Sequence, residues 1–175
     1  MSQLNFIKTR FSVRKFKDQQ VEDNKIKEIL ECGRQAPSGL NNQPWTFIVI
    51  KNNEIKEKIA SCTKYGTILS SANVLIAVFF KEDEGYNRTK DIQALGACIE
   101  NMMLAIHVLG LGGVWIGEIL NQRQNVEVIL EVPKTFELQA VIALGYPADN
   151  LKKTSSRKEL KTITYLNKYN EKINF

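Results

Sequence analysis

A neutral, polar stretch is the first candidate for a functional site in this chain. Residues 36–45 read APSGLNNQPW and contain no acid, no base and no nucleophile paired with a base. Asn and Gln side chains each offer both a hydrogen-bond donor and an acceptor, so they can recognise a polar ligand without imposing a charge on it. Pro37 and Gly39 are expected to fix an unusual backbone path that lets a ligand approach closely. Trp45 either covers an apolar ring or fills the core, and we favour the core.

The rest of the chain offers little chemistry of its own. His107 is the single histidine, and because it has no Cys or carboxylate companions at ligand spacing, a structural role explains it better than a metal site or a catalytic triad. Cys32, Cys62 and Cys98 form no CxxC pattern, so neither a zinc site nor a disulfide framework is expected, and Cys98 is expected in the core. The segment GLGG (110–113) follows a helical pattern and precedes a strand pattern, the reverse of a dinucleotide-binding loop, and is interpreted as a helix cap.

These absences leave two classes of function. The chain either binds a partner without reacting, or it holds a cofactor that supplies the chemistry. The second class gives residues 36–45 a role, because the pyrimidine edge of a flavin alternates C=O and N–H groups that amide side chains can match.

Positive charge gathers in two windows near opposite ends of the chain. The net charge is +5, from 24 Lys and Arg against 19 Asp and Glu. Residues 8–17 and 152–161 hold ten of these basic residues, where composition alone predicts about three. If the two ends meet, the windows could grip one phosphate group. Taken alone, they favour two solvated basic faces, and a nucleic-acid surface is a further alternative.

Hydrophobic periodicity predicts helices that alternate with strands, in a chain of 175 residues that is long enough for one domain with a real core. The expected helices are 21–35, 54–60, 91–109 and 121–130, the last with Asn121 as its N-cap. The expected strands are 46–50, 74–80, 114–116 and 138–146. The 91–109 helix is apolar over so much of its surface that it is either buried or faces another subunit. This order predicts α/β or α+β layers around a central sheet and leaves the strand order open.

The remaining segments bear on location and on substrate access. The beginning of the chain, MSQLNFIKTR, has no long apolar run and no small-residue cleavage site, and the longest apolar run, NVLIAVFF, is too short to span a bilayer. We therefore expect a cytoplasmic protein and no contact with a membrane. Residues 81–90 are charged and are expected to form a surface loop rather than a lid.

Four sequence motifs, in this order, resemble those of the FMN-dependent nitroreductase family and its compact members. They are TRFSVRKF (9–16), APSGLNNQPW (36–45), GLGGVWIGEI (110–119) and LGYP (144–147). The resemblance covers nearly the whole chain, and the second motif is quite specific at its distance from the first. It implies an α+β fold with a central, mostly antiparallel sheet flanked by helices in three layers. It also implies an intertwined homodimer in which residues 1–175 form a single FMN-binding domain and residues 151–175 extend onto the partner subunit.

The resemblance assigns the cofactor-binding residues as well. Arg10 and Ser12 match positions that contact the FMN phosphate, and Arg14 matches the basic position beside the flavin N1/O2 edge. The loop that the partner subunit lays against FMN matches Pro37, Ser38, Gly39 and Asn41. The turn over the other face of the flavin, where a backbone N–H points at N5, matches Ile116, Gly117 and Glu118.

The C-terminal window supplies the last of these positions. Arg157 matches the basic residue that reaches the FMN phosphate from the end of the chain. The family often has a lysine two positions earlier, where this chain has Ser155, so Lys153 or Lys158 is the expected substitute. Residues 61–72 match no flavin-contacting segment of the larger family members, and no role is carried over to them.

The function implied is that of an NAD(P)H-dependent FMN oxidoreductase without a metal. A hydride passes from NAD(P)H to flavin N5, and in a ping-pong cycle a nitroaromatic, a quinone or a similar electrophile then takes the electrons. No side chain is expected to act as a catalytic acid or base, because positioning supplies the catalysis. Two alternatives stay open: another flavin reaction on the same scaffold, and a basic nucleic-acid-binding protein without enzymatic activity. The second alternative leaves residues 36–45 without a role.

Overall fold

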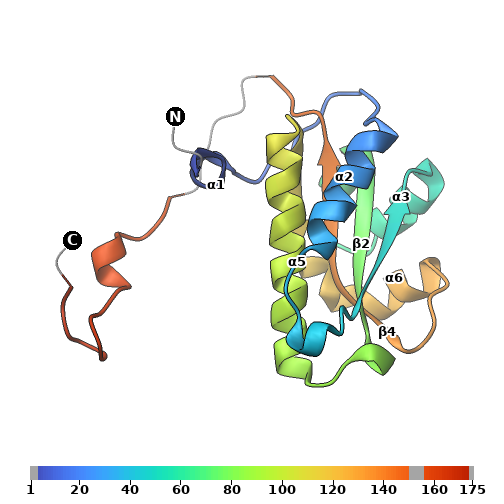
Figure 1. Ribbon diagram of the computed structural model, residues 1–175. Coiled ribbons are helices and arrows are strands. Elements are labelled where there is room, and N and C mark those ends of the chain that lie inside the picture. The colour runs from blue at the N-terminus through green and yellow to red at the C-terminus, as the bar shows by residue number, and fades with distance from the viewer. Residues whose placement is uncertain (1–3, 150–155, 174–175) are drawn as a thin grey trace.

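The fold is built on one antiparallel sheet. The structure is a computed structural model that describes residues 4–149 and 156–173. Its sheet has four strands in the order β1-β2-β4-β3 (Figure 1). They are β1 (Trp45–Ile50), β2 (Val74–Lys81), β3 (Gly112–Ile116) and β4 (Phe136–Gly145). All four expected strands are therefore present, and all neighbours pair antiparallel.

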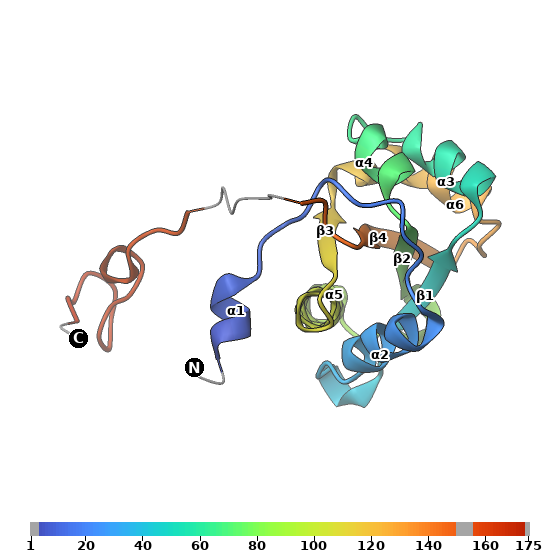
Figure 2. The same ribbon diagram turned by 90° about the horizontal axis from the view of Figure 1, so that it is seen from above.

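Helices cover both faces of this sheet and give three layers (Figure 2). One face carries α2 (Asp23–Arg34) and α5 (Arg88–Val108). The other face carries α3 (Asn53–Ala60), α4 (Gly66–Ser71) and α6 (Arg123–Ile129). Short 3-10 turns lie at Gly39–Asn41, Glu82–Glu84, Glu118–Gln122 and Leu160–Thr162. This is the α+β, three-layer architecture that the resemblance implied, so the predicted fold class is confirmed.

Strand β2 shows why the sequence has a continuous apolar run there. It is the central partner of β1 and β4, and helices cover both of its faces. Ile76 and Val78 belong to the core under α2 and α5, whereas Leu75 and Ala77 belong to the core under α3, α4 and α6. Because successive side chains point to opposite faces, every position of such a strand must be apolar.

Helix α5 is longer at its start than the apolar periodicity indicated. Asn87 caps it, since its side-chain Oδ1 accepts a hydrogen bond from the backbone N–H of Lys90 at 3.2 Å. Gly110 follows its end with a φ of 76°, and the N–H groups of residues 110 and 111 bond to carbonyls of the last helical turn. The interpretation of GLGG as a helix cap is therefore correct.

Some local features differ from the prediction, among them helix α1 (Asn5–Thr9), which the periodicity did not indicate. Asn121 does not cap α6, because it lies inside a 3-10 turn and donates to Glu118 Oε1 at 3.4 Å, and α6 begins only at Arg123. Helix α4 was not predicted, because its six residues are too few to show a helical period. Packing of the fully buried Leu69 holds it in place rather than intrinsic helix propensity.

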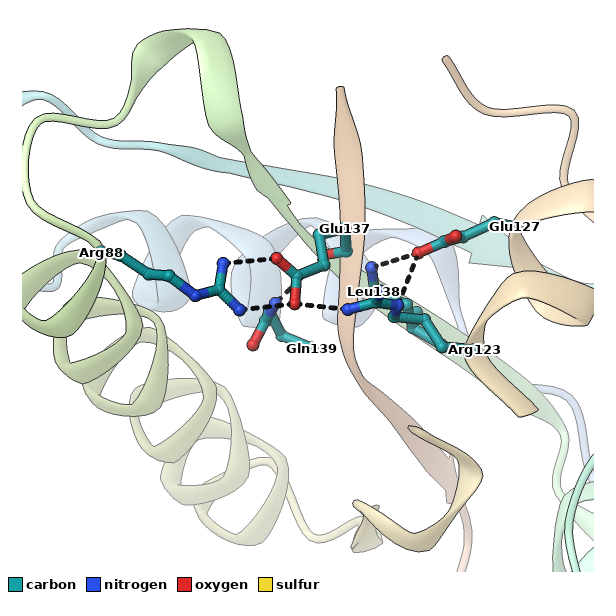
Figure 3. A network of polar contacts seen from close by, with 6 residues as sticks. All are labelled: Arg88, Arg123, Glu127, Glu137, Leu138 and Gln139. Atoms are coloured by element: carbon teal, nitrogen blue, oxygen red, sulfur yellow. Dashed lines mark hydrogen bonds and ion pairs between the residues drawn. The ribbon is translucent and has the colours of Figure 1, made fainter. Parts of the chain in front are cut away.

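A buried carboxylate on β4 connects the two helical layers (Figure 3). Glu137 is 9% exposed and accepts two hydrogen bonds from Arg88 of α5, at 2.5 and 2.8 Å, and one from Arg123 of α6, at 2.6 Å. Arg123 also pairs with Glu127 at 3.5 Å. The hydrogen bonds from Arg88 are the main cause that lowers the pKa of Glu137 from its ordinary value of 4.5.

Replacing Glu137 by glutamine is expected to lower the free energy of unfolding by about 1–3 kcal/mol at neutral pH, because the amide turns a donor toward an arginine. A carboxylate whose pKa is lower in the folded state than in the unfolded state stabilises the fold at pH values above its unfolded-state pKa. This stabilisation is lost as the pH falls through its folded-state pKa. The difference between wild type and Glu137→Gln should therefore shrink below about pH 4.5. Urea unfolding across this pH range measures it, with Glu54→Gln on the exposed side of α3 as a control. An equal difference at all pH values would contradict the assignment.

Candidate functional site

The first group of candidate residues lies on an extended segment beside β3. Residues 10–16 run along this edge strand, and the N–H of Val13 donates to a β3 carbonyl at 2.9 Å. Val13 is buried against Gly112, where an added Cβ would come within 2.6 Å of its side chain. Arg10, Ser12 and Arg14, the candidate residues of the first motif, lie on this same segment.

The two arginines of this segment differ in their surroundings. The Arg10 side chain is 17% exposed, and its Nε lies 3.4 Å from Glu100 Oε1 on α5. Arg14 is exposed and donates to the backbone carbonyl of Ser12 at 3.5 Å. A guanidinium carries five N–H donors in a fixed fork that suits phosphate oxygens. Arg10 is thus held in place by a carboxylate, while Arg14 is open to solvent.

The turn at the end of β3 leaves open space at its glycine. Gly117 is exposed and has φ −88° and ψ −21°, which any residue can adopt. An added Cβ would meet nothing closer than Trp115 Nε1, at 3.8 Å. Ile116, which precedes it, is buried. The backbone therefore does not require a glycine here, and its effect is to leave room for a ligand against the main chain.

The side chain of Glu118 holds a neighbouring turn that sequence reasoning did not find. Its Oε2 accepts hydrogen bonds from Thr63 Oγ1 and, at 3.3 Å, from the backbone N–H of Lys64. The bond from Thr63 is the main cause that lowers the pKa of Glu118. Lys64 Nζ also lies 4.0 Å from Glu118 Oε1. Thr63 and Lys64 thus border the turn at residues 116–118, and no local motif in residues 61–72 signals this contact.

The loop at residues 36–43 follows a strained path, but for a different reason than expected. Leu40, Asn41 and Gln43 have φ values of 54°, 56° and 49°, and a left-handed conformation costs a non-glycine residue about 1–2 kcal/mol. Gly39 is not left-handed. An added Cβ there would come within 2.2 Å of Tyr86 Oη. The expectation that Gly39 sets the loop path is therefore wrong, since the glycine makes room for a tyrosine ring.

Two hydrogen bonds within the loop keep this path. The backbone N–H of Gln43 donates to Ser38 Oγ at 3.0 Å, and Gln43 Nε2 donates to the carbonyl of Asn41 at 3.2 Å. Pro37 and Asn41 are exposed. Trp45, which follows the loop, packs against the core, as favoured from the sequence. The loop therefore presents an exposed edge that its own side chains stabilise.

The protomer does not bring the two groups together. Figure 2 looks along α5 and shows residues 10–16 and β3 on one side of this helix and the loop at residues 36–43 on another. Arg157 is exposed, and its guanidinium donates to the carbonyl of Ser156 at 2.9 Å. It belongs to a C-terminal segment that runs away from the layers (Figure 1). Ser155 and Lys153 lie outside the described residues.

A profile of the nitroreductase family matches residues 7–64 and 60–146. The chain belongs to the nitroreductase family. One relative is a provisionally named NADH dehydrogenase/NAD(P)H nitroreductase of Methanothermobacter thermautotrophicus. It is 35% identical to the present chain over 154 residues, which cover 86% of this chain and 80% of the relative.

Solved structures of the family have the same fold. A provisionally named nitroreductase of Desulfovibrio desulfuricans, in complex with FMN, is 41% identical and superposes with a TM-score of 0.89, covering 95% of this nitroreductase-family chain and 96% of the other. An FMN-dependent nitroreductase of Clostridium difficile is 25% identical with a TM-score of 0.84, covering 95% and 99%.

The remaining titratable candidates of this nitroreductase-family protein are structural. His107 Nε2 lies 2.9 Å from Thr9 Oγ1 and so links α5 to the short helix α1 (Asn5–Thr9). Cys98 is fully buried, and burial raises the pKa of its thiol to about 12. Within residues 4–149 and 156–173, no group of three or more potential ligands could hold a metal ion. No helix in that part of the chain is long and apolar enough to cross a membrane.

Proposed function

We propose that this protein is an FMN-dependent NAD(P)H oxidoreductase that acts as a homodimer on nitroaromatics, quinones or similar electrophiles. One observation carries the proposal: residues that match the two walls of the family's flavin pocket lie on different sides of α5 (Figure 2). A second copy of the chain brings one wall to the other. The likeness to an FMN complex over nearly the whole chain supports the choice of cofactor.

The described residues have the charges and hydrogen-bond donors that the phosphate and the ring edge of FMN require. A phosphate dianion is best held by fixed, forked donors, which Arg10 and Arg157 supply, with Ser12 as a hydroxyl donor. Lys158, next to Arg157, provides the second cation of the tail. Arg14 is exposed on the same segment as Arg10 and places a positive charge beside the N1/O2 edge, which favours electron uptake there.

The other residues shape the space around the ring. The partner's copy of the loop, with Pro37, Ser38, Gly39 and Asn41, forms one wall. The turn with Ile116, Gly117 and Glu118 forms the other, and at Gly117 the main chain is open to close approach. When bound, FMN supplies the redox chemistry by taking a hydride from NAD(P)H and passing the electrons to the acceptor in a ping-pong cycle. The protein contributes binding, orientation and exclusion of water.

The C-terminal segment has the features expected of an extension that packs on a partner subunit. Its apolar side chains remain exposed in the protomer, Leu160 at 59% and Tyr169 at 77%, and it runs away from its own layers (Figures 1 and 2). Several large exposed apolar side chains on one segment are typical of an interaction surface. We therefore propose that residues 1–175 make one FMN-binding domain whose C-terminal extension, from residue 151, packs on the partner subunit.

The outward side of α5 is the proposed centre of the dimer, and Gly96 tests it. An added Cβ at Gly96 meets nothing within 4 Å in the protomer. Gly96→Leu should therefore leave the protomer folded, and it even improves intrinsic helix propensity by about 0.5–1 kcal/mol. It is expected to convert the dimer to monomer in light scattering coupled to gel filtration. Lys58→Leu on the exposed side of α3 is the control, and a Gly96→Leu protein that stays dimeric would contradict this interface.

The proposed function is tested on the purified protein. We expect a flavin spectrum, anaerobic bleaching by NADH or NADPH in stopped-flow measurements, and reoxidation by an acceptor panel of nitroaromatics, quinones and halogenated aromatics. Parallel initial-rate lines would support the ping-pong cycle. A colourless protein that takes up no added FMN would refute the proposal, and strong binding to a DNA duplex would then favour the nucleic-acid alternative.

A further inference from the structure

We propose that Asp91 is a positioning residue: its buried carboxylate clips the strained loop at residues 38–43 to the turn at residues 84–87. In the dimer this clip holds the wall that the loop presents to the partner's FMN. The role toward the partner's FMN rests on the proposed function, whereas the clip itself concerns the protomer alone.

The carboxylate of Asp91 receives hydrogen bonds from both segments. Asp91 is 0% exposed and lies in the first turn of α5. Its Oδ2 accepts from the backbone N–H groups of Tyr86 at 3.0 Å and Asn87 at 2.9 Å, and its Oδ1 accepts from Asn42 Nδ2 at 2.8 Å. Among the described residues no lysine or arginine forms an ion pair with it. Hydrogen bonds from the loop and the turn, rather than a cation, therefore satisfy both of its oxygens.

The loop side of the clip has only one possible orientation. Asn42 Nδ2 donates to Asp91 Oδ1 and also to the backbone carbonyl of Glu84 at 3.0 Å. Both neighbours can only accept, so the amide nitrogen must face them. Asn42 Oδ1 is consequently buried, and within the described residues it has no hydrogen-bond partner. An amide held this way, with its oxygen unpaired, indicates that the two bonds from its nitrogen decide where the loop lies.

The strain of the loop explains why a clip is needed. Leu40, Asn41 and Gln43 are all left-handed, and the bonds from Gln43 to Ser38 and Asn41 stay within the loop. They preserve its internal shape but do not fix it to the rest of the protein. Asp91 belongs to the rigid helix α5 and supplies that connection. It also fixes the N–H of Tyr86, whose ring fills the space beside Gly39.

The contact geometry suggests a substitution that breaks one half of the clip. In Asp91→Asn the remaining oxygen can still accept from the two backbone N–H groups, but the new amide then faces Asn42 Nδ2, donor against donor. The double variant Asp91→Asn/Asn42→Asp restores a donor–acceptor pair with the roles exchanged. It also sets a carboxylate against the carbonyl of Glu84, so recovery is expected to be partial. Asp83→Asn removes an exposed negative charge from the adjacent 3-10 turn and is the matched control.

Two readouts on the full-length protein test the clip. Hydrogen–deuterium exchange of the apoprotein should show faster exchange at residues 36–44 in Asp91→Asn, with β2 unchanged. Titration with FMN, followed by its fluorescence, should show a dissociation constant at least about tenfold higher, which corresponds to about 1.4 kcal/mol. Asp83→Asn should match wild type in both, and the double variant should recover part of each loss.

Two results would overturn the clip: wild-type exchange at residues 36–44 in Asp91→Asn, or a double variant no better than the single one. Should Asp91→Asn fail to fold, Asn42→Ala removes the same bond from the loop side and leaves Asp91 its backbone donors. Wild-type exchange in that variant would also overturn the proposal. If the wild-type protein binds no FMN, the proposed function fails, and the exchange readout still decides on the clip.

Discussion

Replacing Arg10 by alanine is expected to raise the dissociation constant for FMN by about 10- to 100-fold. A hydrogen bond to a charged group contributes about 1.5–3 kcal/mol, and each 1.4 kcal/mol is a factor of ten. Arg10 is the least exposed arginine of the N-terminal segment and is already oriented by Glu100, so little of its binding energy is spent on ordering the side chain. Titration of the apoprotein with FMN at fixed salt measures the effect.

The fold itself should tolerate this change. The pair between Arg10 Nε and Glu100 Oε1 is partly exposed, and such pairs contribute at most about 1 kcal/mol. Arg10→Lys keeps the charge but loses the fork, so its affinity for FMN should lie between those of wild type and alanine. Lys58→Ala removes an exposed cation paired with Glu54 on α3 and controls for net charge. An unchanged affinity in Arg10→Ala would remove Arg10 from the phosphate site.

Replacing Gly117 by valine is expected to slow flavin reduction by NAD(P)H by about 100-fold while FMN stays bound. Hydride transfer needs donor and acceptor atoms in close contact, and a displacement of about 1 Å costs a factor of this order. The space beside Gly117 is open in the protomer, since an added Cβ meets only Trp115 Nε1 at 3.8 Å. A branched side chain would occupy that space. Anaerobic stopped-flow measurements of flavin bleaching report the rate directly.

The valine variant should not act through stability. Gly117 has φ −88° and ψ −21°, so a side chain causes no backbone strain. Gly117→Ala gives a graded control, with a smaller loss of rate and the same melting temperature. A valine variant that is reduced at the wild-type rate would show that Gly117 does not face the reacting edge of the flavin.

The sequence predicted those elements whose own residues carry a strong pattern. Strand β2 is buried on both faces and therefore has a continuous apolar run, and helix α5 has a long apolar periodicity because one side of it packs in the core. Helix α4 was missed because six residues do not show a period and its stability comes from packing. The strand order could not be predicted, because it depends on which strands pair in three dimensions and not on the pattern within each strand.

The candidate site could be proposed from the sequence as a set of residues but not as an arrangement. The motifs that resemble the family select Arg10 and Gly117 as candidates, and their contact with FMN stays a prediction. The contact between Glu118 and Thr63 joins segments far apart in the chain, and no local signal in either one reveals it. The effect of Gly39 on the loop path was misjudged for the same reason, since the ring that needs its space comes from Tyr86.

The separation by α5 of the two proposed pocket walls has a genetic consequence. In the proposed homodimer each pocket would take residues 10–14 from one copy and the loop at residues 36–43 from the other. A mixed dimer of an Arg10→Ala chain and a chain with a defective loop then collects both lesions in one pocket and leaves the second pocket intact. Two inactive alleles of this gene are therefore expected to complement each other when both are expressed in one cell, whereas two alleles that damage the same wall are not.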